Sequence, residues 1–278
     1  MKPVLFFVFI LFLTQGSIAQ SKIKKAEESL NNTTESVSES ENNITYFNNN
    51  DSSSNGNFFA DVFGELFIQI FAYTVYGIAI ESPFETNNSG SYAFVSKFPY
   101  NNSTQGQYTY EWNEDTPIIR TTFSARYISE NSRINGTHLN FDTRFLKRFG
   151  FEANYLQLWE KNPYFGTDNL AMYTALAKYH RVRTEKFNLW WGLGASYIDG
   201  DVNDFGFTYG LGVELFFARP LSLETIFNQS LINGETVNKF DGLLNYHLKN
   251  YKVTGGYEHI RIGNQNFSTL VLGAGIFF

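Results

Sequence analysis

Charged side chains recur at alternate positions along the second half of the chain, and they are the residues most able to support chemistry. In an extended strand, residues two apart point to the same face of the sheet. The charges that fall on one face have nearly balanced signs, and they are Arg120, Arg126, Asp142, Arg144, Glu152, Glu214, Glu224, Asp241, Lys252 and Glu258, with Lys178 beside them. Opposite charges enclosed together form pairs, so the spacing predicts a charge-paired network. A selective pore would instead present a ring of one sign.

Histidine and serine are the residues that could make this protein an enzyme. Nucleophilic catalysis needs a hydroxyl or thiol beside a base, and the chain has four histidines, at positions 138, 180, 247 and 259, and no cysteine. None of the four lies in a Gly-x-Ser-x-Gly turn or another recognisable catalytic arrangement. We therefore expect no enzymatic activity, although a Ser/His dyad assembled by the fold remains open.

Two glycine or aspartate patterns suggest cofactors but lack essential members. The segments "GLGASY" and "YGLGVE" contain Gly-x-Gly without the third glycine that opens a nucleotide-binding helix. In "DGDVND", Asp204 stands where a calcium loop needs glycine, and no glutamate follows at the closing position. We expect no metal and no other cofactor.

The elements that position these charges are alternating strands. In "DFGFTYGLGVELFF", Phe207, Leu211 and Leu215 fall on one face, while Gly210 and Glu214 fall on the other. The preceding segment "KFNLWWGLGASYI" has the same pattern. Aliphatic residues flanked by aromatic ones are typical of a lipid-facing strand with an aromatic belt at each interface. The aromatic share of 18% with a mean hydropathy of only −0.25 fits such alternation along the chain.

The predicted organisation has four parts. Residues 1–19 have the layout of a signal peptide, with a lysine, a short apolar run and small residues before the expected cleavage site. Residues 20–57 form a Ser/Asn-rich leader that we expect to be disordered, because it has too few apolar residues to offset its chain entropy. Residues 58–115 contain an apolar segment that fits either extra strands or a periplasmic helix. Residues 116–278 contain about ten alternating segments, separated by links that alternate between long and short.

With these features the chain resembles the bacterial outer-membrane β-barrel proteins. The resemblance covers residues 116–278 and implies an all-β fold, a transmembrane antiparallel up-and-down barrel of 10 to 12 strands. It also implies that the last strand carries the signal read by the barrel-assembly machinery, on the side chains of Leu272, Ala274, Ile276 and Phe278.

The resemblance places the protein in the bacterial outer membrane, exported through the periplasm. Its expected partners are outer-membrane lipid and, during biogenesis, the assembly machinery. The net charge of −6 argues against nucleic acid, and small solutes stay open as ligands.

The predicted function is that of a structural or narrow-channel, porin-like barrel. Two alternatives remain: a lipid-modifying enzyme of the lipase or acyltransferase class, and a soluble β-sandwich binding protein.

Overall fold

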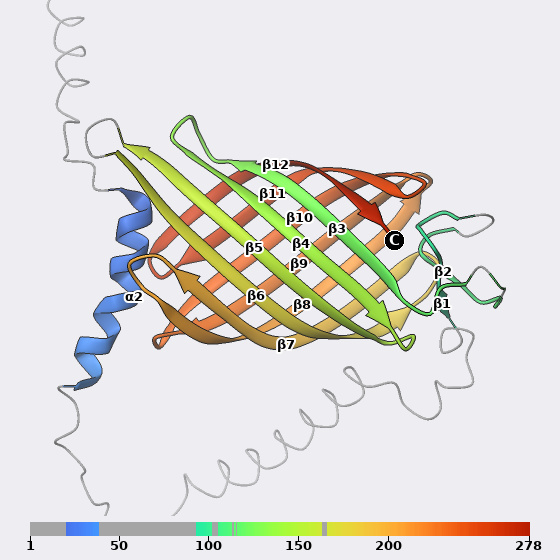
Figure 1. The fold of residues 1–278 in the computed structure, drawn as a ribbon, viewed down its shortest axis with the longest axis horizontal. Coiled ribbons are helices and arrows are strands. Elements are labelled where there is room, and N and C mark those ends of the chain that lie inside the picture. The colour runs from blue at the N-terminus through green and yellow to red at the C-terminus, as the bar shows by residue number, and fades with distance from the viewer. Residues whose placement is uncertain (1–20, 39–92, 102–104, 113, 115, 163–165) are drawn as a thin grey trace, which may run out of the picture.

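The computed structural model describes residues 21–38, 93–101, 105–112, 114, 116–162 and 166–278. Ten antiparallel strands close into a barrel, with β12 hydrogen-bonded to β3, and the two-stranded sheet of β1 (Phe94–Val95) and β2 (Tyr108–Thr109) lies at one end (Figure 1). The barrel strands are β3 Arg120–Ser129, β4 Ile134–Phe145, β5 Phe149–Asn162, β6 Gly166–Arg183, β7 Phe187–Asp199, β8 Asp204–Ala218, β9 Leu221–Ile232, β10 Glu235–Leu248, β11 Tyr251–Ile262 and β12 Gln265–Phe277. The predicted fold class is confirmed. No described strand extends the barrel beyond ten.

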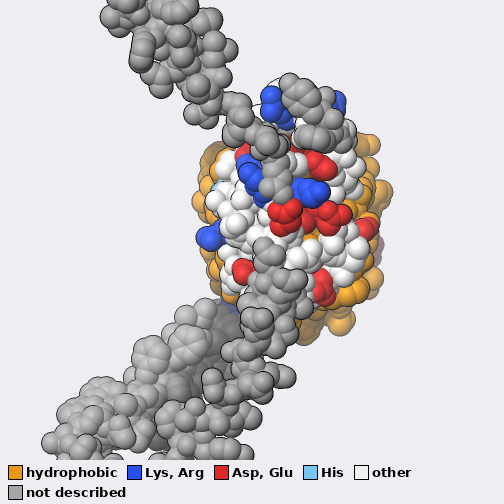
Figure 2. Space-filling model, turned by 90° about the vertical axis from the view of Figure 1, so that its left-hand side faces the viewer, with side chains coloured by type: hydrophobic (Ala, Val, Ile, Leu, Met, Phe, Trp, Pro, Cys, Tyr) orange, Lys and Arg blue, Asp and Glu red, His pale blue; other side chains and the backbone are white. Residues whose placement is uncertain are grey.

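The two faces of each strand follow the alternation of the sequence. In β8, Phe207, Leu211 and Leu215 are 52%, 49% and 40% exposed, whereas Thr208 and Glu214 are buried in the barrel. Apolar side chains thus cover the outside of the barrel, and the space-filling view along the axis shows them as a band around its sides (Figure 2). An outer surface this apolar is the surface that a lipid bilayer requires.

The predicted alternation of long and short links is wrong. At one rim the strands are joined by residues 130–133, 200–203, 233–234 and 263–264, and at the other by 146–148, 184–186, 219–220 and 249–250. The polar residues interpreted as long loops, such as those around Asn162 and Gly166, instead extend the β5–β6 ladder. Backbone pairing continues past the apolar part of these strands, because each added residue pair satisfies further N–H and C=O groups.

A helix occupies part of the leader that was expected to be disordered, so that expectation is wrong for residues 22–38. Helix α2 (Lys22–Ser38) lies across one end of the barrel, which we name the α2 rim (Figure 1). Its Ile23, Ala26 and Leu30 recur at helical spacing and are fully buried against the barrel interior. An isolated helix of this composition would gain little from such a narrow apolar stripe. The barrel mouth supplies the partner surface.

Specific contacts fix α2 to the strand ends and links of its rim. Glu160 Oε2 accepts hydrogen bonds from Ser21 Oγ at 2.8 Å and from the Ile23 N–H at 3.0 Å, and Lys22 Nζ lies 2.6 Å from Glu130 Oε1. The Asp201 N–H donates to Glu27 Oε1 at 2.8 Å. Polar and charged side chains therefore face outward over this mouth, as Figure 2 shows. The described part of the chain contains no helix long and apolar enough to span a bilayer.

The remaining predicted parts of the chain are only partly described. Strands β1 and β2 form a small sheet at the opposite end of the barrel, which we name the β1–β2 rim. The predicted signal peptide 1–19, the rest of the leader and most of the apolar segment in 58–115 lie outside the described residues. The choice between extra strands and a periplasmic helix for that segment stays a prediction.

Candidate functional site

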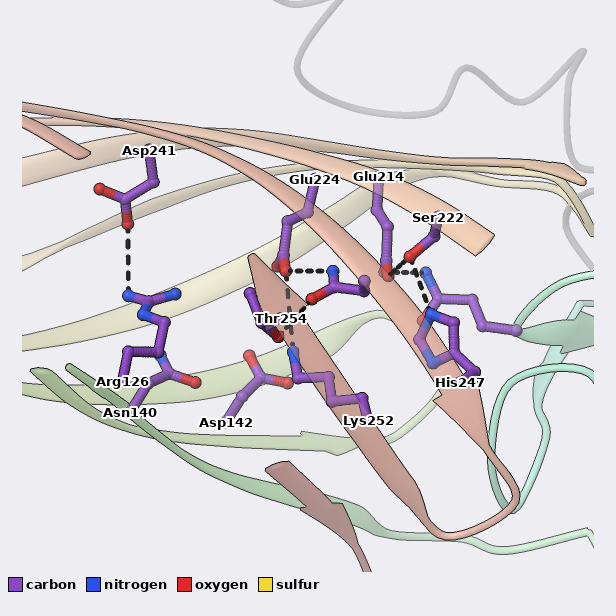
Figure 3. Close-up of polar contacts among 12 residues, drawn as sticks. Arg126, Asn140, Asp142, Glu214, Ser222, Glu224, Asp241, His247, Lys252 and Thr254 are labelled. Carbon is purple, nitrogen blue, oxygen red and sulfur yellow. Dashed lines mark hydrogen bonds and ion pairs between the residues drawn. The ribbon is translucent and has the colours of Figure 1, made fainter. Parts of the chain in front are cut away.

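The structure places all ten predicted charges in the barrel lumen. Seven of them are buried: Arg120, Arg126, Asp142, Glu152, Glu214, Asp241 and Glu258. The other three, Arg144, Glu224 and Lys252, line a small cavity together with five of the buried ones. They come from β3, β4, β5, β8, β9, β10 and β11, and their alternate positions along each strand direct the side chains inward. Figure 3 shows several of them meeting across the lumen.

The cluster nearest the α2 rim is built around Arg126. Its Nη2 lies 3.5 Å from Asp241 Oδ2 (Figure 3) and 3.0 Å from Glu258 Oε1, so one guanidinium joins β3 to β10 and β11. Lys239 Nζ lies 3.4 Å from the same Asp241 oxygen, and His138 Nδ1 lies 3.0 Å from Glu258 Oε1. Two cations thus face two carboxylates.

A second cluster surrounds Lys178 of β6. Its ammonium contacts Asp142 and lies 2.7 Å from Glu152 Oε2, and all three side chains are buried. Asn154 Nδ2 donates to the other oxygen of Glu152 at 2.6 Å, and Arg144 Nε lies 3.4 Å from Asp142 Oδ1. Each carboxylate therefore has more than one polar partner, as charges removed from water require.

Glu224 and Lys252 form a third, looser pair. Lys252 Nζ lies 3.7 Å from Glu224 Oε2, which also accepts a hydrogen bond from Asn245 Nδ2 at 3.1 Å (Figure 3). Thr254 in turn donates to Asn245 Oδ1 at 2.7 Å. These contacts join neighbouring strands β9, β10 and β11.

Residues of the β1–β2 rim complete the network from outside the barrel wall. Gln107 Oε1 accepts from Arg120 Nη2 at 2.8 Å and from Arg144 Nη1 at 2.6 Å, while its Nε2 donates to Glu214 Oε2 at 3.0 Å. Tyr108 is buried and donates to Asn188 Oδ1 at 2.8 Å. Gln107 and Tyr108 therefore cover this mouth of the barrel, and the Gln107 amide lies among the lumen charges.

Tyr100 closes the same mouth by an aromatic contact. Its ring packs edge-on against Phe216 and His247, with ring centroids 5.6 and 5.8 Å apart, and its hydroxyl donates to the Leu221 carbonyl. Burial and the nearby Glu214 carboxylate raise the pKa of Tyr100 to about 12. The hydroxyl therefore stays protonated and remains a donor over the physiological range.

Two Ser/His pairs meet within the described residues, and neither has the arrangement of a catalytic triad. On the outer face, Ser268 Oγ lies 3.1 Å from His259 Nδ1 and accepts a hydrogen bond from the Tyr257 hydroxyl at 3.0 Å. Ser222 Oγ lies 2.8 Å from His247 Nε2 and 3.1 Å from Glu214 Oε1 (Figure 3). Glu214 accepts from the serine hydroxyl, and no carboxylate of the described residues is hydrogen-bonded to His247. A catalytic triad requires the acid on the histidine.

The carboxylates and histidine around Arg126 also resemble a metal site by distance. Nitrogen and oxygen atoms of His138, Asp241 and Glu258 lie within 4.8 Å of one another. However, Arg126 and Lys239 contact the same carboxylate oxygens. A divalent ion there would meet two cations at close range, so the cluster fits an ion-pair network better than a metal centre.

Little space is left inside the barrel. A cavity of about 40 Å³ lies among the polar side chains of the lumen, with room for a few water molecules. On the α2 side the lumen is filled by an apolar cluster in which Leu158, Ile198, Ile232 and Ile260 surround the buried face of α2. Polar contacts, apolar packing and the two rim segments thus fill much of the lumen formed by the described residues.

Sequence reasoning missed several members of the network. Lys239 has the same parity as Asp241 and could have been found by that signal. His138 was considered as a possible catalytic residue but not as a lumen residue, although it lies four positions before Asp142 and therefore on the same face of β4. Gln107 and Tyr108 gave no signal, because they precede the barrel in the chain and reach the lumen only through the tertiary fold.

Comparisons with known proteins concern the fold alone. The sequence matches no protein-family model and no curated protein. Among solved structures, the chain is similar to the outer membrane protein Ail of Yersinia pestis, at 16% identity and a TM-score of 0.33, over 57% of this chain and 99% of that one. It is also similar to the KdgM porin in complex with disordered oligogalacturonate, at 10% identity and a TM-score of 0.36, over 56% of this chain and 99% of that one.

A third similar structure is the N-terminal β-barrel domain of Pseudomonas aeruginosa OprF, at 10% identity and a TM-score of 0.30, over 57% of this chain and 97% of that domain. At such values the likeness assigns neither a ligand nor an activity. The strand pairing, and the assignment of outward and inward faces, come from the structure of this chain and not from these comparisons. The described barrel has the architecture of a bacterial outer-membrane β-barrel: ten antiparallel strands closed on themselves, with apolar side chains outside and polar side chains within.

Proposed function

We propose that this protein is a bacterial outer-membrane β-barrel with a closed lumen, acting as a structural barrel and not as an open diffusion pore. The observation that carries the proposal is the pairing of lumen charges across the barrel, sealed by α2 at one rim and by Gln107, Tyr108 and Tyr100 at the other. The apolar outer surface supports the membrane location, because so large an apolar surface would be unfavourable in contact with water.

The closed lumen also bears on the narrow-channel alternative. A permeant solute would have to unseat a rim segment and separate opposite charges that hold each other in a confined space. We therefore place a gated narrow channel second. Any opening would begin at a rim.

We further propose that the barrel-assembly machinery recognises β12. Leu272, Ala274, Ile276 and Phe278 share the outward face of this strand, and β12 makes the closing pairing with β3. These side chains would be available to a partner while the barrel is still open. The lipid-modifying enzyme is not proposed, because neither Ser/His pair of the described residues has an acid hydrogen-bonded to its histidine.

The test expresses the full chain in a Gram-negative host and separates the inner and outer membranes. We expect the protein in the outer membrane, with a gel mobility that changes on heating. Proteoliposomes should swell in small sugars no faster than protein-free liposomes, with an open porin as the positive control. Recovery as a soluble protein would contradict the membrane location, and swelling at the porin's rate would contradict the closed lumen.

A further inference from the structure

We propose that a cavity at the β1–β2 rim binds an anionic phospholipid of the surrounding leaflet. The cavity measures about 210 Å³ and lies between the segment that enters β3 and the turn after β4. Its apolar lining includes Phe94, Val95, Trp112, Pro117, Ile118 and Leu146. Pockets that enclose a whole drug-sized ligand measure roughly 300 to 1,000 Å³, so this one takes one end of a larger molecule.

The charged side chains that line the cavity are basic, which favours an anionic ligand. Arg144 and Lys147 line the cavity, and no acidic side chain of the described residues does. The Arg144 guanidinium already contacts two lumen side chains, Gln107 and Asp142. Lys147 is exposed, with its Nζ 4.2 Å from the centroid of the Phe94 ring, and no carboxylate of the described residues lies within ion-pair distance of it. This ammonium is available for a phosphate.

The cavity adjoins the apolar outer wall of the barrel, and this location favours a lipid over a soluble anion. Ile118, Leu146 and Trp112 are 81%, 67% and 66% exposed, and Phe149 of β5 continues this apolar surface onto the outer wall of the barrel. A ligand that enters from the bilayer covers these side chains with hydrocarbon while its headgroup stays at the interface beside Lys147. A soluble anion would leave them in water.

The experiment uses Trp112 as the reporter in the full-length protein. The protein is reconstituted into phosphatidylcholine vesicles that contain increasing amounts of either dibrominated phosphatidylglycerol or dibrominated phosphatidylcholine. Subtracting the quenching of a Trp112→Phe variant isolates the Trp112 signal from the other tryptophans. We expect half-quenching at an about fivefold lower fraction of the brominated anionic lipid, as fits one favourable lysine–headgroup contact.

Two charge-reversal variants provide the matched comparison. Lys147→Glu should abolish the preference for the anionic lipid. Lys249→Glu should keep it, because Lys249 is also an exposed turn lysine with positive φ at the same rim but does not line the cavity. Equal quenching of the wild type by both lipids would overturn the proposal. So would an equal loss of preference in the two variants, which would indicate general surface charge. Neither result depends on whether the lumen conducts.

Discussion

At the scale of single residues, Lys178 shows how the lumen tolerates its charges. Its ammonium is shared by Asp142 and Glu152, and it also lies 4.5 Å from the centroid of the Trp190 ring. Removing one member of a buried pair usually costs more than the pair contributes, because the remaining charge stays out of water. The network should therefore be sensitive to single changes and less sensitive to compensated ones.

Lys178→Met tests this arrangement. We expect a loss of about 3 kcal/mol in the free energy of unfolding, at the lower end for a broken buried pair because a small wet cavity adjoins the site. The double variant Lys178→Met with Glu152→Gln should recover part of that loss. Urea unfolding in lipid vesicles measures both. An unchanged single variant, or a double variant less stable than the single one, would count against the paired lumen.

Glu27 links the docking of α2 to pH. Burial at the rim, reinforced by the nearby Asp201 and Asp168 carboxylates, raises the pKa of Glu27 above its usual value of 4.5, although the Asp201 N–H partly offsets this. The docked state then binds more protons than the undocked state between the usual and the raised pKa. Docking is therefore most favourable below pH 4.5 and weakens as the pH rises through this window.

Hydrogen exchange of the α2 amides checks the Glu27 prediction. After correction for intrinsic rates, protection should be greater at about pH 4 than at about pH 7. Glu27→Gln keeps an oxygen acceptor without a charge and should make protection independent of pH. Glu28→Gln, on the exposed side of the helix, should behave as the wild type. Protection that increases with pH in the wild type would refute the assigned sign.

At the scale of elements, the strands could be predicted from the sequence and the rim segments could not. The period of two in β8 is enough to predict both the outward Leu211 and the inward Glu214. Helix α2 has only three buried apolar residues in its described side chains, and their burial depends on a mouth formed by strands far away in sequence. The leader's composition could not reveal that surface. The role of Gln107 could not be predicted either, because its partners Arg120, Arg144 and Glu214 come together only in the folded barrel.

Close packing at α2 also depends on residues that carry no local signal. A Cβ added to Gly200 would lie 1.9 Å from Glu27 Oε1, and one added to Gly263 would lie 2.0 Å from Ser29 Oγ. Both glycines stand in links of the α2 rim, where they let the helix approach the backbone. From the sequence alone they are ordinary turn glycines.

The closing strand carries the third prediction. Phe278 exchanges backbone hydrogen bonds with Thr121 at 2.9 and 3.2 Å, and its ring is 65% exposed on the outer face. Phe278→Asp places a charge at the interface and at the seam between β12 and β3, so we expect less heat-modifiable barrel in the outer membrane and more protein in the periplasm. Phe278→Tyr keeps an interfacial aromatic and should assemble normally. Normal folded levels of the aspartate variant would remove the support for an assembly role of this residue.

At the scale of the whole molecule, the barrel is closed by three different kinds of interaction. Apolar packing fills the α2 side, ion pairs span the middle, and the segment preceding β3 inserts hydrogen-bonding and aromatic side chains at the opposite rim. A barrel of about this size has an interior just wide enough for its own side chains. The inward charges therefore form a packed, ion-paired interior, in which a few buried atoms, such as Arg120 Nε, Arg126 Nε and Asp241 Oδ1, have no hydrogen-bond partner among the described residues.

Single-channel recording in a planar bilayer tests the closed lumen most directly. The full-length protein is inserted after its folded state has been verified by heat-modifiable mobility, and current is recorded across a range of voltages. We predict a silent bilayer, because no ion can pass without unseating a rim segment and separating paired charges. Large, steady conductance steps from the folded wild-type protein would contradict the closed lumen.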